Sequence, residues 1–171
     1  MEYPQDLFFD IETLINVAQP TRILLIGDCD PAFLSAYQEQ KTLLQQPCTL
    51  KTIACQDIEQ LWSEEAYDTA IVVNLFEHLD KNKGMQVLSR LRDVLSPQYC
   101  IALPVTNNIN TPEWHLTDLF SFALSKVSGY SHENQPEIGL FKYNINDYKK
   151  TPDWLNADNW ANPQMWGKYW W

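Results

Sequence analysis

Short apolar runs alternate along this chain with segments of helical periodicity. The runs at 22–27, 69–74 and 99–103 contain few polar residues, and 69–74 is rich in β-branched side chains. A strand covered on both faces has this composition, whereas a strand with one face in water alternates apolar and polar residues. The pattern predicts an α/β fold, in which a mostly parallel, doubly wound sheet lies between two layers of helices.

The segments between these runs carry start and stop signals for helices. Asp30 followed by Pro31 is typical of a helix N-terminus, because an acid caps the free N–H groups and proline fits the first turn. Ser96-Pro97 ends another helix. We predict helices at 4–17, 30–45, 57–65, 82–95 and 113–127, and further strands at 49–54 and 138–145, the last of either direction.

The length of 171 residues fits a single domain, residues 1–171. We divide it into an N-terminal helix (1–20), an α/β core (21–147) and a tail (148–171) that holds five of the seven tryptophans. The tail rings are predicted to cover an apolar part of the core, with Trp154 and Trp160 largely buried. The alternative is that they form an interaction surface, where tryptophan is enriched.

The formal net charge of −10 restricts the partners. Because this charge repels phosphate backbones and anionic headgroups, we predict neither direct nucleic-acid binding nor a membrane surface as partner. No apolar run approaches the roughly 18 residues that span a bilayer, and the N-terminus lacks the pattern of a signal peptide. These features predict a soluble, cytoplasmic protein whose partner is another protein or a small molecule.

The cysteines show no paired spacing and predict neither disulfides nor a metal site. Zinc sites and disulfide frameworks usually contain closely spaced cysteine pairs such as CxxC, and this chain has no CxxC pair. Three of the four cysteines lie in or beside apolar runs, as buried thiols of a reducing compartment do. The four are Cys29, Cys48, Cys55 and Cys100.

One stretch resembles class I S-adenosylmethionine (SAM) dependent methyltransferases. Tyr67-Asp68, an apolar strand and Glu77-His78-Leu79 are similar to the "FD-(apolar)-LEHL" segment of that family, and the predicted helix and strand that follow continue in register. The resemblance covers roughly residues 20–127. It implies a Rossmann-like methyltransferase fold in a shortened form, with SAM as the cofactor that an active member would bind.

The resemblance also implies where a cofactor would bind. In the family, glycines at alternate positions after the first strand let the methionine part of SAM approach the backbone. Here Gly27 stands at the first glycine, Cys29 at the second and Pro31 at the third, while Leu25 replaces the family's acid. The cofactor-binding residues implied by the resemblance are Gly27, Asp28, Cys29, Asp57, Leu75 and Phe76.

A second departure concerns the acid that holds the ribose in the family. Residues 55–61 resemble the "GDAEEL" segment after the family's third strand, which implies that one strand-helix unit and the ribose acid are missing. Asp57 would then lie where the family contacts adenine, and a helix cap is the alternative role. Asp28 and Asp30 are acids that could bind a methionine amino group, with capping again the alternative for Asp30.

No catalytic residue is predicted. Asn74 is followed by Leu75 and Phe76 rather than by the Pro-Pro-Tyr of amide and base methyltransferases. The resemblance implies a structural role for His78, and the histidines at 115 and 132 have no carboxylate partner evident from spacing. The leading hypothesis is a non-catalytic or divergent methyltransferase-like domain that binds a protein or small ligand. The alternatives are a SAM-dependent methyltransferase of unknown substrate and a structural, homodimeric subunit.

Overall fold

A six-stranded sheet forms the centre of the protein in a computed structural model that describes residues 3–106, 108, 111–131, 136–148, 165 and 168. The first four strands in its order are parallel, and the last two are antiparallel to their neighbours. The strands, in spatial order, are β2 (Thr49–Ile53), β1 (Arg22–Ile26), β3 (Thr69–Val73), β4 (Gln98–Val105), β6 (Glu137–Asn144) and β5 (Ser125–Tyr130).

Helices connect these strands, and several are short or irregular. Two 3-10 helices, η1 and η2, follow the first two strands, and α3 continues into one π-helical turn, η3. The helical elements are α1 (Gln5–Ala18), η1 (Pro31–Leu34), α2 (Ser35–Leu43), η2 (Cys55–Ser63), α3 (Lys81–Arg90), η3 (Leu91–Leu95), α4 (Leu116–Ser121) and α5 (Ile145–Tyr148). Asp30 caps η1, as predicted, and its carboxylate accepts a 2.9 Å hydrogen bond from the Ala32 N–H.

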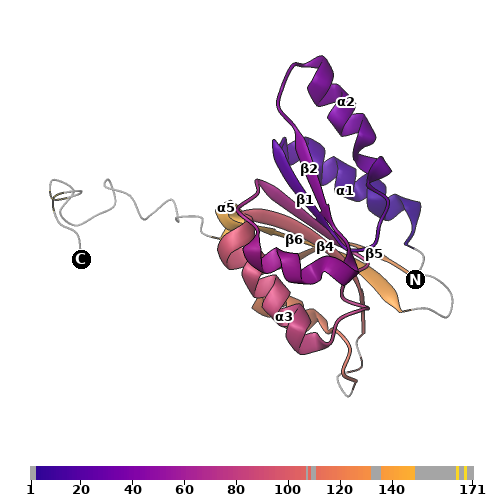
Figure 1. The fold of residues 1–171 in the computed structure, drawn as a ribbon. Coiled ribbons are helices and arrows are strands. Elements are labelled where there is room, and N and C mark those ends of the chain that lie inside the picture. Colours follow the sequence, from indigo (N-terminus) through magenta and orange to yellow (C-terminus); the bar gives the residue numbers. More distant parts are fainter. Residues whose placement is uncertain are drawn as a thin grey trace.

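The sheet separates two apolar cores, because successive side chains of a strand point to opposite faces. Ile23 and Leu25 of β1 face the core formed with α1 and α2, whereas Leu24 faces the core formed with η2 and α3. Figure 1 shows α1 and α2 on one side of the sheet and α3 on the other. This is the predicted three-layer, doubly wound α/β architecture.

The sheet is shortened at the β2 edge. A doubly wound sheet of order 3-2-1-4-5-6 has two strands beyond its first strand on this side, whereas the described residues provide only β2. β2 pairs directly with β1, from Arg22↔Thr49 to Ile26↔Ile53, and so takes the position next to the first strand. One strand-helix unit of the full order has no counterpart among the described residues, as the alignment of residues 49–57 with the family's third strand implies.

The predicted helix at 113–127 is wrong over its second half. Helix α4 has only six residues, and Ala123 adopts a left-handed conformation with φ of 60° that ends it. The next residues form β5, which pairs with β6. Leu116, Leu119 and Leu124 pack in one core, but only the first two lie in α4, and strand pairing overrides the helical period beyond it.

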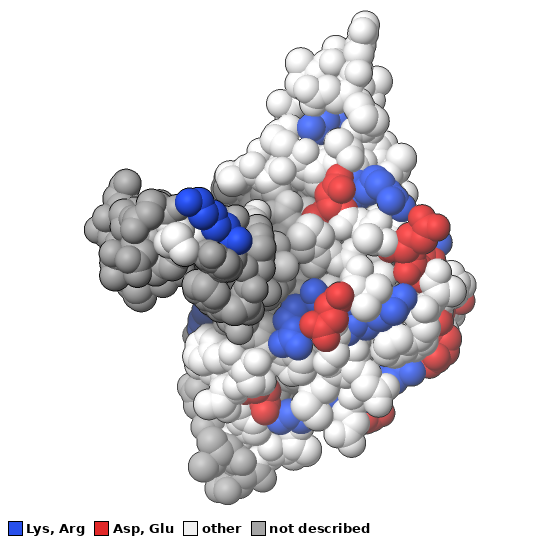
Figure 2. Space-filling view, turned by 90° about the vertical axis from the view of Figure 1, so that its left-hand side faces the viewer, with Lys and Arg blue, Asp and Glu red and all other residues white. Residues whose placement is uncertain are grey.

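Charged side chains of opposite sign lie next to one another on the surface. Figure 2 shows basic and acidic groups interspersed over one face. Lys51–Glu64 and Lys83–Glu59 are two of the ion pairs of the described residues. All four cysteines are free thiols, of which Cys100 is buried. No helix among the described residues is both long and apolar enough to cross a bilayer. The predicted burial of Trp154 and Trp160 falls outside the described residues, as does His132.

Candidate functional site

The carboxyl ends of β1, β2 and β3 meet at one edge of the sheet and form a topological switch point. The η1 and α2 segment after β1 packs on one face through Leu34 and Tyr37, whereas α3 after β3 packs on the other face through Val87 and Leu88. The two connections thus leave the sheet in opposite directions. Doubly wound sheets bind ligands in the crevice at this point.

Gly27 ends β1 in a conformation that only glycine adopts without strain. Its φ is 110°, and a Cβ built on it would lie 1.9 Å from the Val73 carbonyl oxygen. Its N–H donates a 2.9 Å hydrogen bond to the Ile53 carbonyl. The close approach of three strand ends therefore requires this glycine, whether or not a ligand lies beside it.

Hydrogen bonds tie together the loops that follow the three strands. One Asp28 carboxylate oxygen accepts a bond from the Cys55 N–H at 3.0 Å, and the Asp28 carbonyl accepts one from the Asn74 amide at 3.0 Å. The Cys55 thiol donates to the Asn74 carbonyl at 3.0 Å. Polar side chains thus link Asp28 after β1, Cys55 after β2 and Asn74 after β3 across the crevice.

His78 joins this group from the turn after β3. The backbone N–H of His78 donates to the Leu75 carbonyl at 3.0 Å, which fixes the turn. One carboxylate oxygen of Asp28, the Sγ of Cys55 and one ring nitrogen of His78 all lie within 4.8 Å of one another. Asp28 and His78 are exposed, and Cys55 is partly buried. We call these three residues the edge cluster.

The thiols at this edge are not activated nucleophiles. Burial raises the pKa of Cys29 to about 12, with further increases from the neighbouring Asp30 and Asp28 carboxylates. Burial also raises the pKa of Cys55 to about 11, and its hydrogen bond with Asp28 raises it further. With pKa values this high, both thiols are protonated at neutral pH. Because only the thiolate is reactive, both are unreactive there.

The N-terminal segment crosses the same edge. The Tyr3 hydroxyl donates a short hydrogen bond to Glu77 Oε1, and burial, followed by the Glu77 charge, raises the pKa of Tyr3 well above its ordinary value. Glu77 Oε2 is buried and has no hydrogen-bond partner among the described residues. A buried carboxylate oxygen without a donor is unusual, because such an atom loses its hydration without compensation.

The residues implied by the family resemblance lie in three places. Gly27, Asp28 and Cys29 lie together in the loop at the carboxyl edge. Asp57 lies in the first turn of η2, where Ala54 and not Asp57 is the N-cap residue. Leu75 and Phe76 are buried in the core that contains α3. Sequence reasoning missed Cys55 and His78, although each follows a predicted parallel strand within a few residues and could have been found by that position.

A cavity of about 490 Å³ opens between the start of α3 and the end of β4. Phe76 and Trp114 form part of its lining and pack edge to face, with ring centroids 5.3 Å apart. Three prolines, Pro104, Pro112 and Pro136, also line it, and Lys81 and Glu113 supply polar groups. A concave, mostly apolar space with a few polar groups is typical of small-ligand sites.

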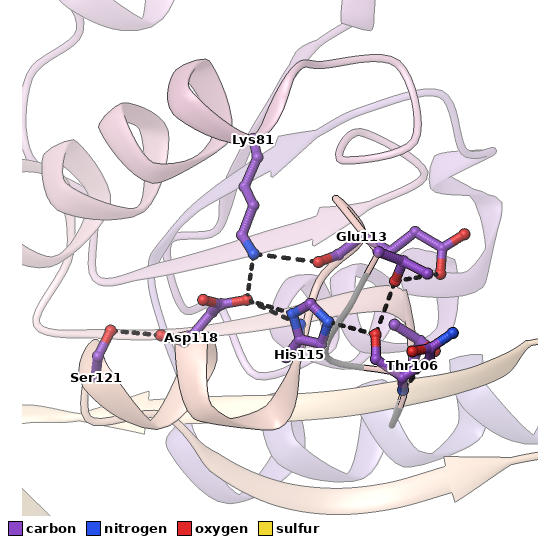
Figure 3. A network of polar contacts seen from close by, with 8 residues as sticks. Lys81, Thr106, Glu113, His115, Asp118 and Ser121 are labelled. Atoms are coloured by element: carbon purple, nitrogen blue, oxygen red, sulfur yellow. Dashed lines mark hydrogen bonds and ion pairs between the residues drawn. The ribbon is translucent and has the colours of Figure 1, made fainter.

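Lys81 and Glu113, which line this cavity, belong to a polar network that Figure 3 shows. The Lys81 ammonium lies 2.6 Å from an Asp118 carboxylate oxygen and 3.1 Å from the Glu113 carbonyl oxygen. His115 places Nδ1 3.3 Å from that carboxylate and Nε2 2.9 Å from the Asn108 carbonyl oxygen. A ring nitrogen that faces a carbonyl oxygen is a donor, so Nε2 carries a hydrogen and binds the Asn108 carbonyl.

Asp118 is the centre of this network. It also accepts a 2.9 Å hydrogen bond from the backbone N–H of His115 at the start of α4. Burial raises the pKa of Asp118, but the hydrogen bonds from Lys81 and from the His115 backbone outweigh it, and the pKa lies below its ordinary value. The carboxylate therefore serves to hold α4 against α3.

The sheet order, the switch point and the glycine turn after the first strand define a class of fold. It is the fold of class I SAM-dependent methyltransferases, in a shortened form with β2 at its edge. The chain belongs to the family described as "Family of unknown function (DUF6231)", whose sequence model matches residues 5–171. A comparison with curated proteins finds no match to the sequence.

Solved structures with this fold are distant in sequence. Magnesium protoporphyrin IX methyltransferase (ChlM) from Synechocystis PCC 6803 with bound SAH superposes with a TM-score of 0.51 at 13% identity, over 81% of each chain. WbdD gives 0.57 at 14% identity, over 85% of this chain and 41% of its own. TehB from Haemophilus influenzae gives 0.51 at 11%, over 78% and 60%. Identities this low establish the fold and leave the activity open.

Proposed function

We propose that this protein is a non-catalytic member of the methyltransferase fold, and that it works by binding a small ligand or a protein. The observation that carries the proposal is the set of hydrogen bonds among Asp28, Cys55 and Asn74. These bonds occupy the crevice at the switch point, where the methionine part of SAM would need access to the backbone of the loop after β1.

The residues of the loop after β1 support the same proposal. Of the three glycine positions of the family, only Gly27 keeps its residue, and this glycine is required by the Val73 carbonyl in any case. Cys29 and Pro31 add side-chain atoms at the other two positions. No acid ends β2, where Ile53 is followed by Ala54 and Cys55, so a ribose would lack its usual carboxylate partner.

The chemistry near the crevice also favours binding over catalysis. The Cys29 and Cys55 thiols have raised pKa values, so neither is an activated nucleophile. The cavity beside Phe76 and Trp114 offers instead an apolar, partly enclosed space, which suits an uncharged or aromatic small molecule.

The test is a calorimetric titration of the purified protein with SAM and with S-adenosylhomocysteine. The protein concentration should detect dissociation constants to about 1 mM, which corresponds to about 4 kcal/mol of binding. We expect no heat of binding with either ligand from a sample that unfolds cooperatively. Micromolar binding of SAM would overturn the proposal.

A SAM-dependent methyltransferase is the second candidate. It is favoured by the switch-point crevice itself and by the fold that this chain has in common with an SAH-bound methyltransferase. If the titration detects binding, the Cys29→Gly variant tests whether SAM binds at the loop after β1. Removing the side chain at the family's second glycine position should then tighten SAM binding, whereas Cys48→Ser should leave it unchanged.

A further inference from the structure

We propose that Asp28, Cys55 and His78 bind one divalent transition-metal ion, with Zn²⁺ as the preferred ion. The three residues follow three different parallel strands, and each offers one ligand atom at the carboxyl edge of the sheet. The inference goes beyond the proposed function and does not rest on it, because a metal site at this edge is compatible with either candidate activity.

The separations of the ligand atoms fit an ion after small side-chain rotations. Zinc lies about 2.0–2.3 Å from N, O and S ligands, so two ligands of a tetrahedral centre stand roughly 3–4 Å apart. The three atoms lie within 4.8 Å of one another without an ion. Asp28 and His78 are exposed, so their side chains can rotate inward without disturbing the core.

The donor types select the class of ion. A thiolate, an imidazole nitrogen and a carboxylate oxygen together suit zinc and its transition-metal neighbours, whereas magnesium and calcium prefer sites made of oxygen alone. The Cys55 thiolate and the Asp28 carboxylate would balance the two charges of the ion. Three protein ligands leave a fourth position of the tetrahedron for water or for a ligand group.

The surroundings of the cluster already orient its ligands. The Cys55 N–H holds one oxygen of Asp28, which leaves the other oxygen available, and such outer hydrogen bonds are what positions ligands in metal sites. The Cys55 thiol, which now donates to the Asn74 carbonyl, would lose its proton to solvent when the sulfur binds the ion.

The field at this edge is negative. The carboxylates of Asp28 and Glu77 both interact electrostatically with Cys55, and Asp30 does so with Cys29. Glu77 also has the buried oxygen that lacks a hydrogen-bond partner among the described residues. A bound cation would be the largest positive charge in this region and would offset these carboxylates.

The test is a titration of the metal-free, untagged full chain with Co²⁺, followed by Zn²⁺. Cobalt bound to a cysteine sulfur gives a charge-transfer band in the near ultraviolet, and a tetrahedral site gives visible bands. We expect one Co²⁺ per chain, both sets of bands and displacement by one equivalent of Zn²⁺. Cys55→Ser should abolish the sulfur band, and His78→Ala and Asp28→Asn should weaken binding about 100-fold or more.

Matched controls separate the cluster from general metal adsorption. Cys48→Ser removes a thiol outside the cluster, and Asp57→Asn removes an acid from the same end of the sheet; both should bind as the wild type does. Cys55→Ser keeps a donor for the Asn74 carbonyl, and Asp28→Asn keeps an acceptor for the Cys55 N–H, so circular dichroism should show these variants folded. Absence of cobalt binding, a sulfur band that survives in Cys55→Ser, or equal losses in the controls would overturn the proposal.

Discussion

Two histidines of this protein each lie near an aspartate, but their surroundings differ. His115 contacts Asp118 and the Asn108 carbonyl through its two ring nitrogens, and Lys81 completes the network. His78 is exposed, and its ring lies near Asp28 and Cys55 in the edge cluster, where the Cys55 N–H and the Asn74 side-chain amide both donate to Asp28. In the network around Asp118, the polar groups make their hydrogen bonds within the protein. In the edge cluster, ligand atoms remain that can bind a metal ion.

This difference separates a structural role from a binding role. A polar group whose hydrogen bonds are all made inside the protein stabilises the fold and gives little to a ligand. A group of convergent donors held in place by backbone bonds is arranged for something outside the protein. We therefore expect substitutions in the network around Asp118 to change stability, and substitutions in the edge cluster to change binding.

The largest effect on the free energy of unfolding is expected at Gly27, which lies where the strands that carry the edge cluster end. Gly27→Ala places a Cβ against the Val73 carbonyl at a φ of 110° and should lower the free energy of unfolding by about 3 kcal/mol or more. Urea unfolding measures this. Gly129→Ala is the matched control, because its new Cβ would meet the flexible Glu137 carboxylate, and it should change stability by less than about 1 kcal/mol. Equal effects would refute the argument.

The next effect tests the network. Asp118→Ala removes the partner of Lys81 and of the His115 N–H, and should cost about 2 kcal/mol at pH 7. The lowered pKa of Asp118 stabilises the fold above its unfolded value of about 4, and this stabilisation is lost as the pH falls through the folded value. Acid unfolding should therefore be less steep below about pH 4 in Asp118→Ala. The exposed Glu39→Ala should leave the acid profile unchanged.

The smallest effects compare the two histidines directly. His115→Ala should lower the free energy of unfolding by about 1 kcal/mol, because two hydrogen bonds are lost. His78→Ala should change it by less than about 0.5 kcal/mol in metal-free protein, since an exposed side chain contributes little. Thermal unfolding of both variants in a chelating buffer measures the difference. A His78→Ala variant as unstable as His115→Ala would assign a structural role to both.

The parallel half of the fold was predictable from sequence, and the antiparallel half was predictable only in part. β1, β3 and β4 correspond to runs that are apolar at successive positions. This pattern is typical of a strand that helices cover on both faces. The segment that became β5 has no such run, and its residues are mostly exposed. Its pairing with β6 is a tertiary contact, and local periodicity carries no information about such contacts.

The sequence points to the loop after β1 for the candidate site, whereas the makeup of the edge cluster could not be predicted from it. Asp28 was identified because the resemblance pointed to the loop after β1. Cys55 and His78 are 23 positions apart in the chain, and no spacing rule for metal or catalytic motifs connects them. What brings them together is the shared carboxyl edge of parallel strands, and that depends on the order of the strands in the sheet.

The position of β2 at the end of the sheet has a consequence for self-association. A terminal strand offers unpaired backbone groups to strands of other molecules, and this is a route to fibrils and aggregates. β2 has only five residues, and Thr49, Lys51 and Thr52 on it are exposed, with the lysine paired to Glu64. Short length and a charge in mid-strand discourage such pairing. An apolar strand at this edge would favour pairing with strands of other molecules, whereas the polar residues of β2 disfavour it.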